Sequence, residues 1–333
     1  FLGRDRIRGH AFLDHLDEVR VHASPPFREA IADTAWTIYG DDGEPVYDSN
    51  LMRLALAYSA DLGLTVSNHC QERALSRDGV MAEGRVSTRL GLAGIPAAAE
   101  EAMVARDISL ADLTGGRLHL AHVSTAGTVE LVRRAKSQGL RVTAEVCPHH
   151  LVLTDRWVMG GHGDVANGPT VFHYDTHTKV YPPLRADHDT KALIDGLVDG
   201  TIDCIATDHA PHDFAGKVCT YQDAEFGISV LETALGSLMT LVHEGKLPLP
   251  VLIERLTAAP ANFLGVGLGS LKTGAPADVT IFDPDAEWVV DSTEFVSKGK
   301  NTPLDGATLK GRVVATIVGG AVRYDARESG SAG

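Results

Sequence analysis

Cysteine, aromatic residues and long apolar runs are all scarce in this sequence. Only 4 of its 333 residues are cysteine and 6% are aromatic. The cysteines stand far apart with no C-x-x-C pair, so neither a disulfide framework nor a cysteine-rich zinc site is indicated. No apolar run approaches the roughly 18 residues that a bilayer span requires, and no signal-peptide core follows the arginine-containing residues 1–8. These absences predict a protein of the reducing cytoplasm with no membrane partner.

Positive charge is scarce as well. The chain has 30 Lys and Arg against 44 Asp and Glu, a net charge of −14. Such a protein repels nucleic acid and anionic lipid, which excludes both classes of partner and leaves a small-molecule substrate. A 44% hydrophobic content is enough to bury the core of one large domain with an appendage.

Short apolar runs alternate with amphipathic stretches from about residue 49 to 245. This rhythm is typical of a parallel barrel or a doubly wound sheet. Ser49 suits a helix N-cap and Gly63 a helix end. The sequence predicts helices over about 50–61, 96–113, 125–138 and 187–200, and strands over 64–67, 117–121, 141–146 and 201–206.

Four predicted strands end in polar groups that can bind metals or transfer protons. They deliver His69, His122, the pair His149–His150, and Asp208. Barrel enzymes assemble their chemistry at the carboxyl ends of several strands, whereas a doubly wound sheet uses only the region of its switch point. We therefore expect an α/β fold of the (β/α)8 type, a metal-dependent hydrolase barrel that is incomplete at its N-terminus.

The pattern changes after about residue 265 to short β runs punctuated by Gly, Pro and Asp. This change predicts a barrel domain over residues 1–265 and a small β-sandwich over residues 266–333. Residues 159–178 are rich in Gly, His and Asp without a period, which indicates a long surface insertion.

The segment A-T-D-H-A-P-H, from Ala206 to His212, directly follows an apolar run. A carboxylate held there can bind a metal and shuttle a proton, although Asp208 suits a helix cap or turn equally well. His69 or His122 alone is more often a structural histidine. Together with Asp208 they favour a metal site. Asp42 by itself indicates a turn.

Several segments resemble the bacterial class I dihydroorotases, over most of the chain from about Gly40 to Val322. The resemblance rests on G-D-D-G-E-P-V-Y-D-S from Gly40, V-S-N-H-C-Q-E around His69, L-G-L-A-G-I-P from Leu90, L-A-H-V-S-T around His122, T-A-E-V-C-P-H-H-L from Thr143, Y-P-P-L-R from Tyr181, G-T-I-D-C-I-A-T-D-H-A-P-H from Gly200, and K-N-T-P-L-D-G from Lys300.

The resemblance implies a zinc-dependent enzyme that reversibly closes N-carbamoyl-L-aspartate to dihydroorotate in pyrimidine biosynthesis, with one or two zinc ions. By position, Asp42 would bridge two metals, and His69 and His122 would hold the second. Asp208 would bind the first metal and act as general acid and base.

The substrate residues follow in the same way. The resemblance implies that His212 binds the substrate carboxylate and that the backbone at Phe226–Gly227 lies near the ring. Tyr181 stands where the family usually has a substrate-contacting asparagine, so ring recognition is expected to differ.

The N-terminal region departs from the family. No two of the fifteen histidines are separated by one residue, so the His-x-His pair of the family's first metal site is absent, and residues 1–35 do not match. We expect impaired activity and a better preserved second-metal half-site.

Two alternatives stay open. Allantoinases and hydantoinases usually bridge their metals with a carboxylated lysine, but no lysine lies between Asp33 and Gly43, which favours dihydroorotase. The second alternative is an inactive subunit that supports aspartate transcarbamoylase. The sequence leaves open whether the chain forms a homo-oligomer.

Overall fold

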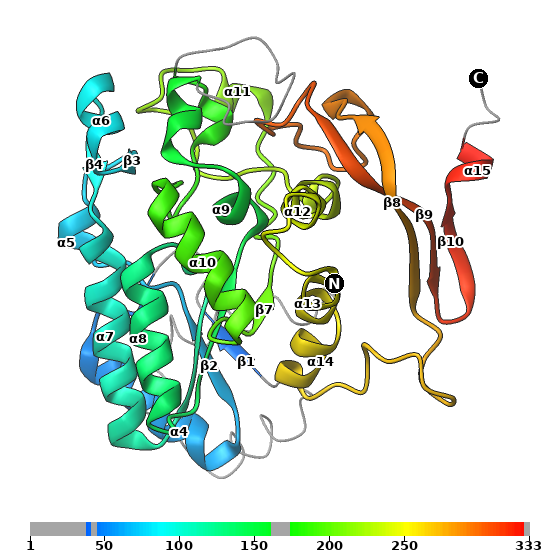
Figure 1. The fold of residues 1–333 in the computed structure, drawn as a ribbon. Helices are drawn as coiled ribbons and strands as arrows, with labels where there is room; N and C mark the ends of the chain where they lie inside the picture. Colours follow the sequence, from blue (N-terminus) through cyan, green and yellow to red (C-terminus); the bar gives the residue numbers. More distant parts are fainter. Residues whose placement is uncertain (1–37, 41–44, 161–173, 330–333) are drawn as a thin grey trace.

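A five-stranded parallel sheet forms the centre of the protein. The computed structural model describes residues 38–40, 45–160 and 174–329 (Figure 1). Every neighbouring pair in the order β1-β2-β5-β6-β7 is parallel. The strands are β1 (Ile38–Gly40), β2 (Thr65–Asn68), β5 (Arg117–Leu120), β6 (Val142–Val146) and β7 (Cys204–Ile205).

Helices alternate with these strands and cover the outside of the sheet (Figure 1). Parallel neighbours require such crossovers, because the chain must return to the starting edge before each new strand. Four of the helices pack side by side in chain order. They are α4 (Ser49–Leu62), α7 (Ala97–Thr114), α8 (Ala126–Ser137) and α10 (Asp187–Asp199).

The helix ends follow local sequence chemistry. Gly63 ends α4 in the left-handed conformation, as predicted, but the N-cap is Asp48 and not Ser49. The Asp48 carboxylate accepts hydrogen bonds from the amides of Asn50 and Leu51, which a serine one residue later does not do here. Thr125 caps α8 by accepting a hydrogen bond from the amide of Thr128.

An apolar core, the most extensive of three buried clusters in the described residues, lies between the sheet and the helices. Its fully buried members include Leu56 of α4, Val66 of β2, Leu118 and Leu120 of β5, and Val132 of α8. Since both faces of a parallel sheet are covered, its strands carry nearly continuous apolar residues. In the described residues, no helix is both long enough and apolar enough to cross a bilayer.

The C-terminal segment forms a separate antiparallel sheet of three strands in the order β10-β9-β8. In the described residues, the C-terminal segment thus forms one sheet, and not the two layers of the predicted β-sandwich. It contacts the barrel where β9 packs against α12 (Ala234–His243). The strands are β8 (Val279–Val289), β9 (Thr308–Val318) and β10 (Ala321–Asp325).

Shorter elements complete the described chain. The predicted insertion lies largely at residues 161–173, outside the described residues; two 3-10 turns, Asp155–Met159 and Thr176–Thr178, flank it. The remaining elements are α5 (Arg73–Ser76), β3 (Met81–Ala82), α6 (Arg85–Leu90), β4 (Gly94–Ile95), α9 (Pro148–Val152), α11 (Phe214–Lys217), α13 (Leu249–Leu256), α14 (Ala258–Leu264), the turn Ser292–Glu294 and α15 (Ala326–Ser329).

Candidate active site

Three of the predicted site residues meet at the carboxyl ends of the parallel strands. His69 follows β2, His122 follows β5, and Asp208 follows β7. All three line one cavity of about 970 Å³. The cavity lies where a barrel brings several strand ends together.

Two of these residues have an unusual backbone. His122 has φ of 34° and Asp208 has φ of 45°, both in the left-handed region that non-glycine residues seldom adopt. Such conformations persist only where the surrounding structure imposes them, and they are concentrated at functional sites. The strand-end turns therefore hold both side chains in orientations that the chain would not choose by itself.

The two histidines face each other across a short gap. His69 Nδ1 lies 3.0 Å from His122 Nε2, and both rings are buried. Burial first, and the neighbouring His122 second, lower the pKa of His69 well below its usual value, so the ring is neutral near pH 7. Two imidazole nitrogens at this separation suit one zinc ion, for which each Zn–N bond is about 2.0–2.1 Å. The outer nitrogens, His69 Nε2 and His122 Nδ1, are buried without a hydrogen-bond partner.

Tyr181 covers one side of this pair. Its ring stacks on His69 with centroids 5.0 Å apart and planes inclined by 19°, and it touches the Phe226 ring at 5.1 Å. The Tyr181 hydroxyl is 3.1 Å from Ser76 Oγ. The aromatic ring thus occupies space beside the metal-binding nitrogens.

Two of the predicted substrate residues line the same cavity. Phe226 and Gly227 line the cavity, and His212 Nε2 donates a hydrogen bond of 2.7 Å to the Phe226 carbonyl. Gly227 has φ of 147°, and an added Cβ would lie 2.7 Å from both the Ala210 carbonyl and His212 Nε2. Only glycine fits this position without moving the wall.

Asn301 holds that wall together from the C-terminal segment. Its Oδ1 accepts hydrogen bonds from the His212 amide and the Ser229 hydroxyl, each 2.9 Å long. Its Nδ2 donates to the carbonyls of Ala210 and Gly227. Through Asn301, the K-N-T-P-L-D-G segment therefore holds the A-T-D-H-A-P-H segment in place.

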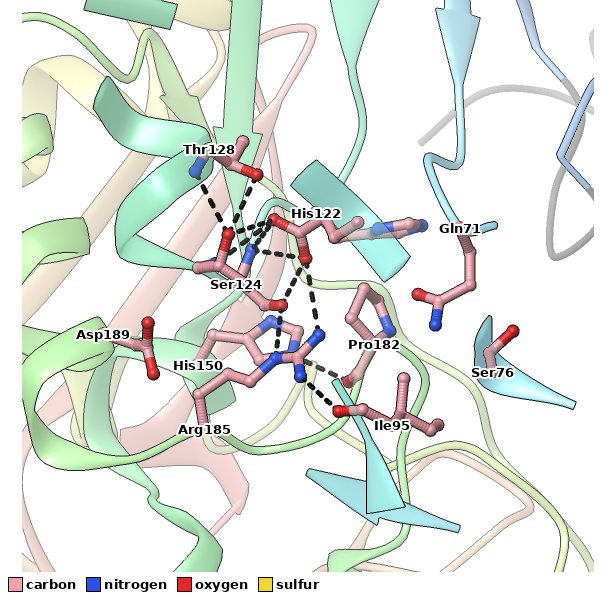
Figure 2. A network of polar contacts seen from close by, with 12 residues as sticks. Gln71, Ser76, Ile95, His122, Ser124, Thr128, His150, Pro182, Arg185 and Asp189 are labelled. Atoms are coloured by element: carbon pink, nitrogen blue, oxygen red, sulfur yellow. Dashed lines mark hydrogen bonds and ion pairs between the residues drawn. The ribbon is translucent and has the colours of Figure 1, made fainter. Parts of the chain in front are cut away.

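A buried carboxylate fixes the turn that follows His122. Glu100 of α7 accepts hydrogen bonds from the amides of Ser124 and Thr125 and from both of their hydroxyls. Arg185 joins the same network through Ser124 and the Ile95 carbonyl (Figure 2). Neither Glu100 nor Arg185 stood out from the sequence, because a glutamate in a helix and an arginine in a loop are ordinarily solvated.

Cys147, His149 and His150 form a second group of buried metal-ligand atoms, all within 4.8 Å of one another. Both nitrogens of His149 are without a hydrogen-bond partner. Burial, and more weakly the charge of Arg185, lower the pKa of His150 to about 3. The same positive charge disfavours a cation at this cluster.

A third group, His119, Glu145 and Cys204, also brings potential ligands together. His119 Nε2 lies 3.2 Å from a Glu145 carboxylate oxygen, and His119 Nδ1 lies 2.8 Å from Thr143 Oγ1. Burial opposes the charge of Glu145, but the contacts with His119 and His122 together outweigh it and lower the Glu145 pKa. His119 Nδ1 thus contacts a hydroxyl and Nε2 lies within ion-pair distance of the carboxylate, which fits a structural pair.

Asp42, the predicted bridging ligand, lies outside the described residues. The described part of the chain thus brings His69, His122, Asp208, Tyr181, Phe226 and Gly227 to one cavity, with His212 hydrogen-bonded behind its wall.

Strand-end imidazoles and an aspartate around one cavity are typical of barrel enzymes. The chain belongs to the amidohydrolase family, whose model matches residues 13–323. The matched region therefore includes residues 13–35, which were expected not to match the dihydroorotases.

Among curated proteins, the chain is 54% identical over 285 residues to the dihydroorotase of Pelotomaculum thermopropionicum and 50% identical over 285 residues to that of Thermoanaerobacter sp.. The matches cover 85% of this chain but only 64% and 63% of those relatives. The chain therefore spans less than two thirds of their length. These similarities confirm the resemblance to dihydroorotases.

Solved structures support the fold. The dihydropyrimidinase from Brevibacillus agri superposes with a TM-score of 0.75 and 21% identity, over 90% of this chain and 66% of that one. The expected amidohydrolase barrel is confirmed.

Proposed function

We propose that this protein is a dihydroorotase, a hydrolase that opens and closes the cyclic amide of dihydroorotate. The observation that carries the proposal is the convergence of His69, His122 and Asp208 on one cavity. The identity of 54% to a dihydroorotase supports the choice of substrate. We also propose zinc, in one or two copies, as the metal.

Each residue has a defined part in this proposal. His69 and His122 hold the metal, and Asp42 would bridge to a second one. A bound zinc supplies a Lewis acid for the ring carbonyl and lowers the pKa of water. Asp208 takes a proton from the attacking water and delivers it to the ring nitrogen that leaves.

We propose that His212, Phe226 and Gly227 orient the substrate. His212 binds the carboxylate of dihydroorotate, and the backbone at Phe226–Gly227 lies against the ring. The Nε2–H of His212 donates to the Phe226 carbonyl, so carboxylate binding through this nitrogen would require that contact to break. Tyr181 replaces an amide with an aromatic ring, so we expect weaker recognition of the ring.

The cytoplasm is the proposed compartment, and the free thiols of Cys70, Cys147, Cys204 and Cys219 suit its reducing conditions. Assembly of copies of this chain, or with aspartate transcarbamoylase, stays a proposal.

Turnover of three cyclic amides tests the proposal. The zinc-loaded protein is assayed with dihydroorotate, allantoin and dihydrouracil, beside Asp208→Asn and the remote control Asp195→Asn, an exposed residue on α10. We expect dihydroorotate hydrolysis in wild type and in Asp195→Asn, and a loss of at least about a hundredfold in Asp208→Asn, as for general acid–base catalysis. Preference for allantoin or dihydrouracil would identify another cyclic amidohydrolase. Equal background rates in all three proteins would favour the non-catalytic subunit, which the missing His-x-His pair supports.

A further inference from the structure

Glu100 belongs to none of the proposed catalytic segments, yet it is bound to one of them. Its side chain lies on α7 and the residue is 2% exposed. Its carboxylate receives the amides of Ser124 at 3.0 Å and Thr125 at 3.2 Å, together with both hydroxyls. These residues come two and three positions after His122, so the carboxylate closes the turn that presents the imidazole.

The turn needs such an anchor. His122 has φ of 34°, a conformation that an L-residue keeps only when its neighbours impose it. On the strand side, the Ala121 amide donates to the Asn68 carbonyl and the Val123 amide donates to the Glu145 carbonyl. On the other side of the turn, where α8 begins, Glu100 restrains the backbone by binding the amides of Ser124 and Thr125.

Arg185 connects the same network to the segment that carries Tyr181. Its Nε donates to Ser124 Oγ at 3.1 Å, and its Nη1 donates to the Ile95 carbonyl at 2.9 Å (Figure 2). Its Nη2 lies 4.0 Å from the Glu100 carboxylate, and both side chains are almost fully buried. Arg185 is four residues after Tyr181, on the segment that also gives the Pro182 carbonyl to His150 at 2.9 Å.

We propose that Glu100 and Arg185 form a positioning pair that sets His122 and Tyr181 relative to each other at the cavity. The inference rests on the proposed function, because it takes His122 as a metal ligand and Tyr181 as part of the substrate cavity. Neither residue is placed against the substrate. Partners that orient a metal-binding histidine typically change metal affinity or activity by about 10- to 100-fold when they are lost.

The alternative is that the pair only stabilises the fold, and a double variant separates the two roles. Removing one member of a buried ion pair destabilises a protein because the other charge is left unpaired, whereas removing both is often tolerated. The variants are Glu100→Gln, Arg185→Gln and the double variant. Glu101→Gln is the matched control, since Glu101 is the next residue on α7 and is only partly buried.

Zinc affinity is measured by chelator competition, and the melting temperature is measured by calorimetry. Steady-state kinetics with dihydroorotate gives kcat and KM. We expect Glu100→Gln to bind zinc about 10- to 100-fold more weakly and to lose kcat, while Glu101→Gln matches wild type. In the double variant, melting temperature should recover while zinc affinity and kcat stay low. Recovery of all three together, or wild-type zinc affinity in Glu100→Gln, would overturn the inference.

Amide hydrogen exchange at residues 123–125 gives a readout that does not depend on turnover. We expect it to be faster in Glu100→Gln and in the double variant than in Glu101→Gln. If wild type does not hydrolyse dihydroorotate but these exchange and zinc differences appear, only the proposed function fails. If exchange is unchanged, the positioning role itself fails.

Discussion

We expect Tyr181 to influence substrate choice, because its ring occupies the space beside His69. We expect Tyr181→Asn to lower the KM for dihydroorotate by roughly tenfold, since an amide would leave room for the ring and supply a hydrogen bond worth about 1 kcal/mol. Steady-state kinetics measures this. Tyr181→Phe, which keeps the ring and removes the hydroxyl that contacts Ser76, should change KM little. An unchanged or higher KM in Tyr181→Asn would show that the aromatic ring assists binding.

Asn301 acts on the substrate wall without touching the cavity. Its side chain makes four hydrogen bonds in a buried position. We expect Asn301→Ala to destabilise the fold by about 1–3 kcal/mol, since it leaves buried partners unpaired, and to raise KM because His212 loses its restraint. Urea unfolding and kinetics measure the two effects. The exposed Asn262→Ala should be neutral in both, and an Asn301→Ala protein as stable as that control would contradict the account.

At the scale of elements, α9 contains a pH-sensitive group. Burial lowers the pKa of His150 from its ordinary 6.5 to about 3. The unfolded chain therefore takes up a proton below pH 6.5 that the folded chain refuses until about pH 3. The stability that neutral His150 contributes is fully present above pH 6.5 and is lost as the pH falls towards 3, at up to about 1.4 kcal/mol per pH unit.

The His150→Gln variant tests this linkage. A glutamine amide can still donate to the Pro182 carbonyl but does not titrate. We expect urea unfolding free energies measured between pH 7 and 4 to fall less steeply in the variant than in wild type. Parallel slopes would mean that His150 is already protonated in the folded protein or is solvated.

Sequence patterns predicted the elements well where an apolar run ends in a recognisable cap. Gly63, Thr125 and Gly200 lie where the pattern placed them. The strand predicted over 201–206 is only Cys204–Ile205, because hydrogen-bond pairing, which the sequence does not specify, sets strand length.

Contacts between elements were less predictable. His69, His122 and Asp208 were found because they end strands, and strand ends share one face of a barrel. Glu100 and Asn301 were not found, since each acts on a segment far along the chain. Glu100 is 24 residues from Ser124, and Asn301 is 89 from His212. Only the packing of α7 on α8 and of the C-terminal segment on the barrel brings them there.

At the scale of the whole molecule, the proposed metal would be held by His69 and His122 at the carboxyl ends of the parallel strands. We expect His122→Ala to release zinc while the melting temperature changes little, because a ligand on the catalytic face seldom supports the barrel core. Elemental analysis after gel filtration measures zinc per chain. The control His188→Ala, exposed on α10, should keep wild-type zinc. Unchanged zinc in His122→Ala would place the metal elsewhere.

Anomalous diffraction at the zinc absorption edge, from crystals grown with zinc, tests the shared cation most directly. We predict a peak between His69 Nδ1 and His122 Nε2, about 2.0–2.1 Å from each, on the cavity side that Asp208 lines. A peak at the Cys147, His149 and His150 cluster instead, or none within bonding distance of His69 and His122, would contradict the account.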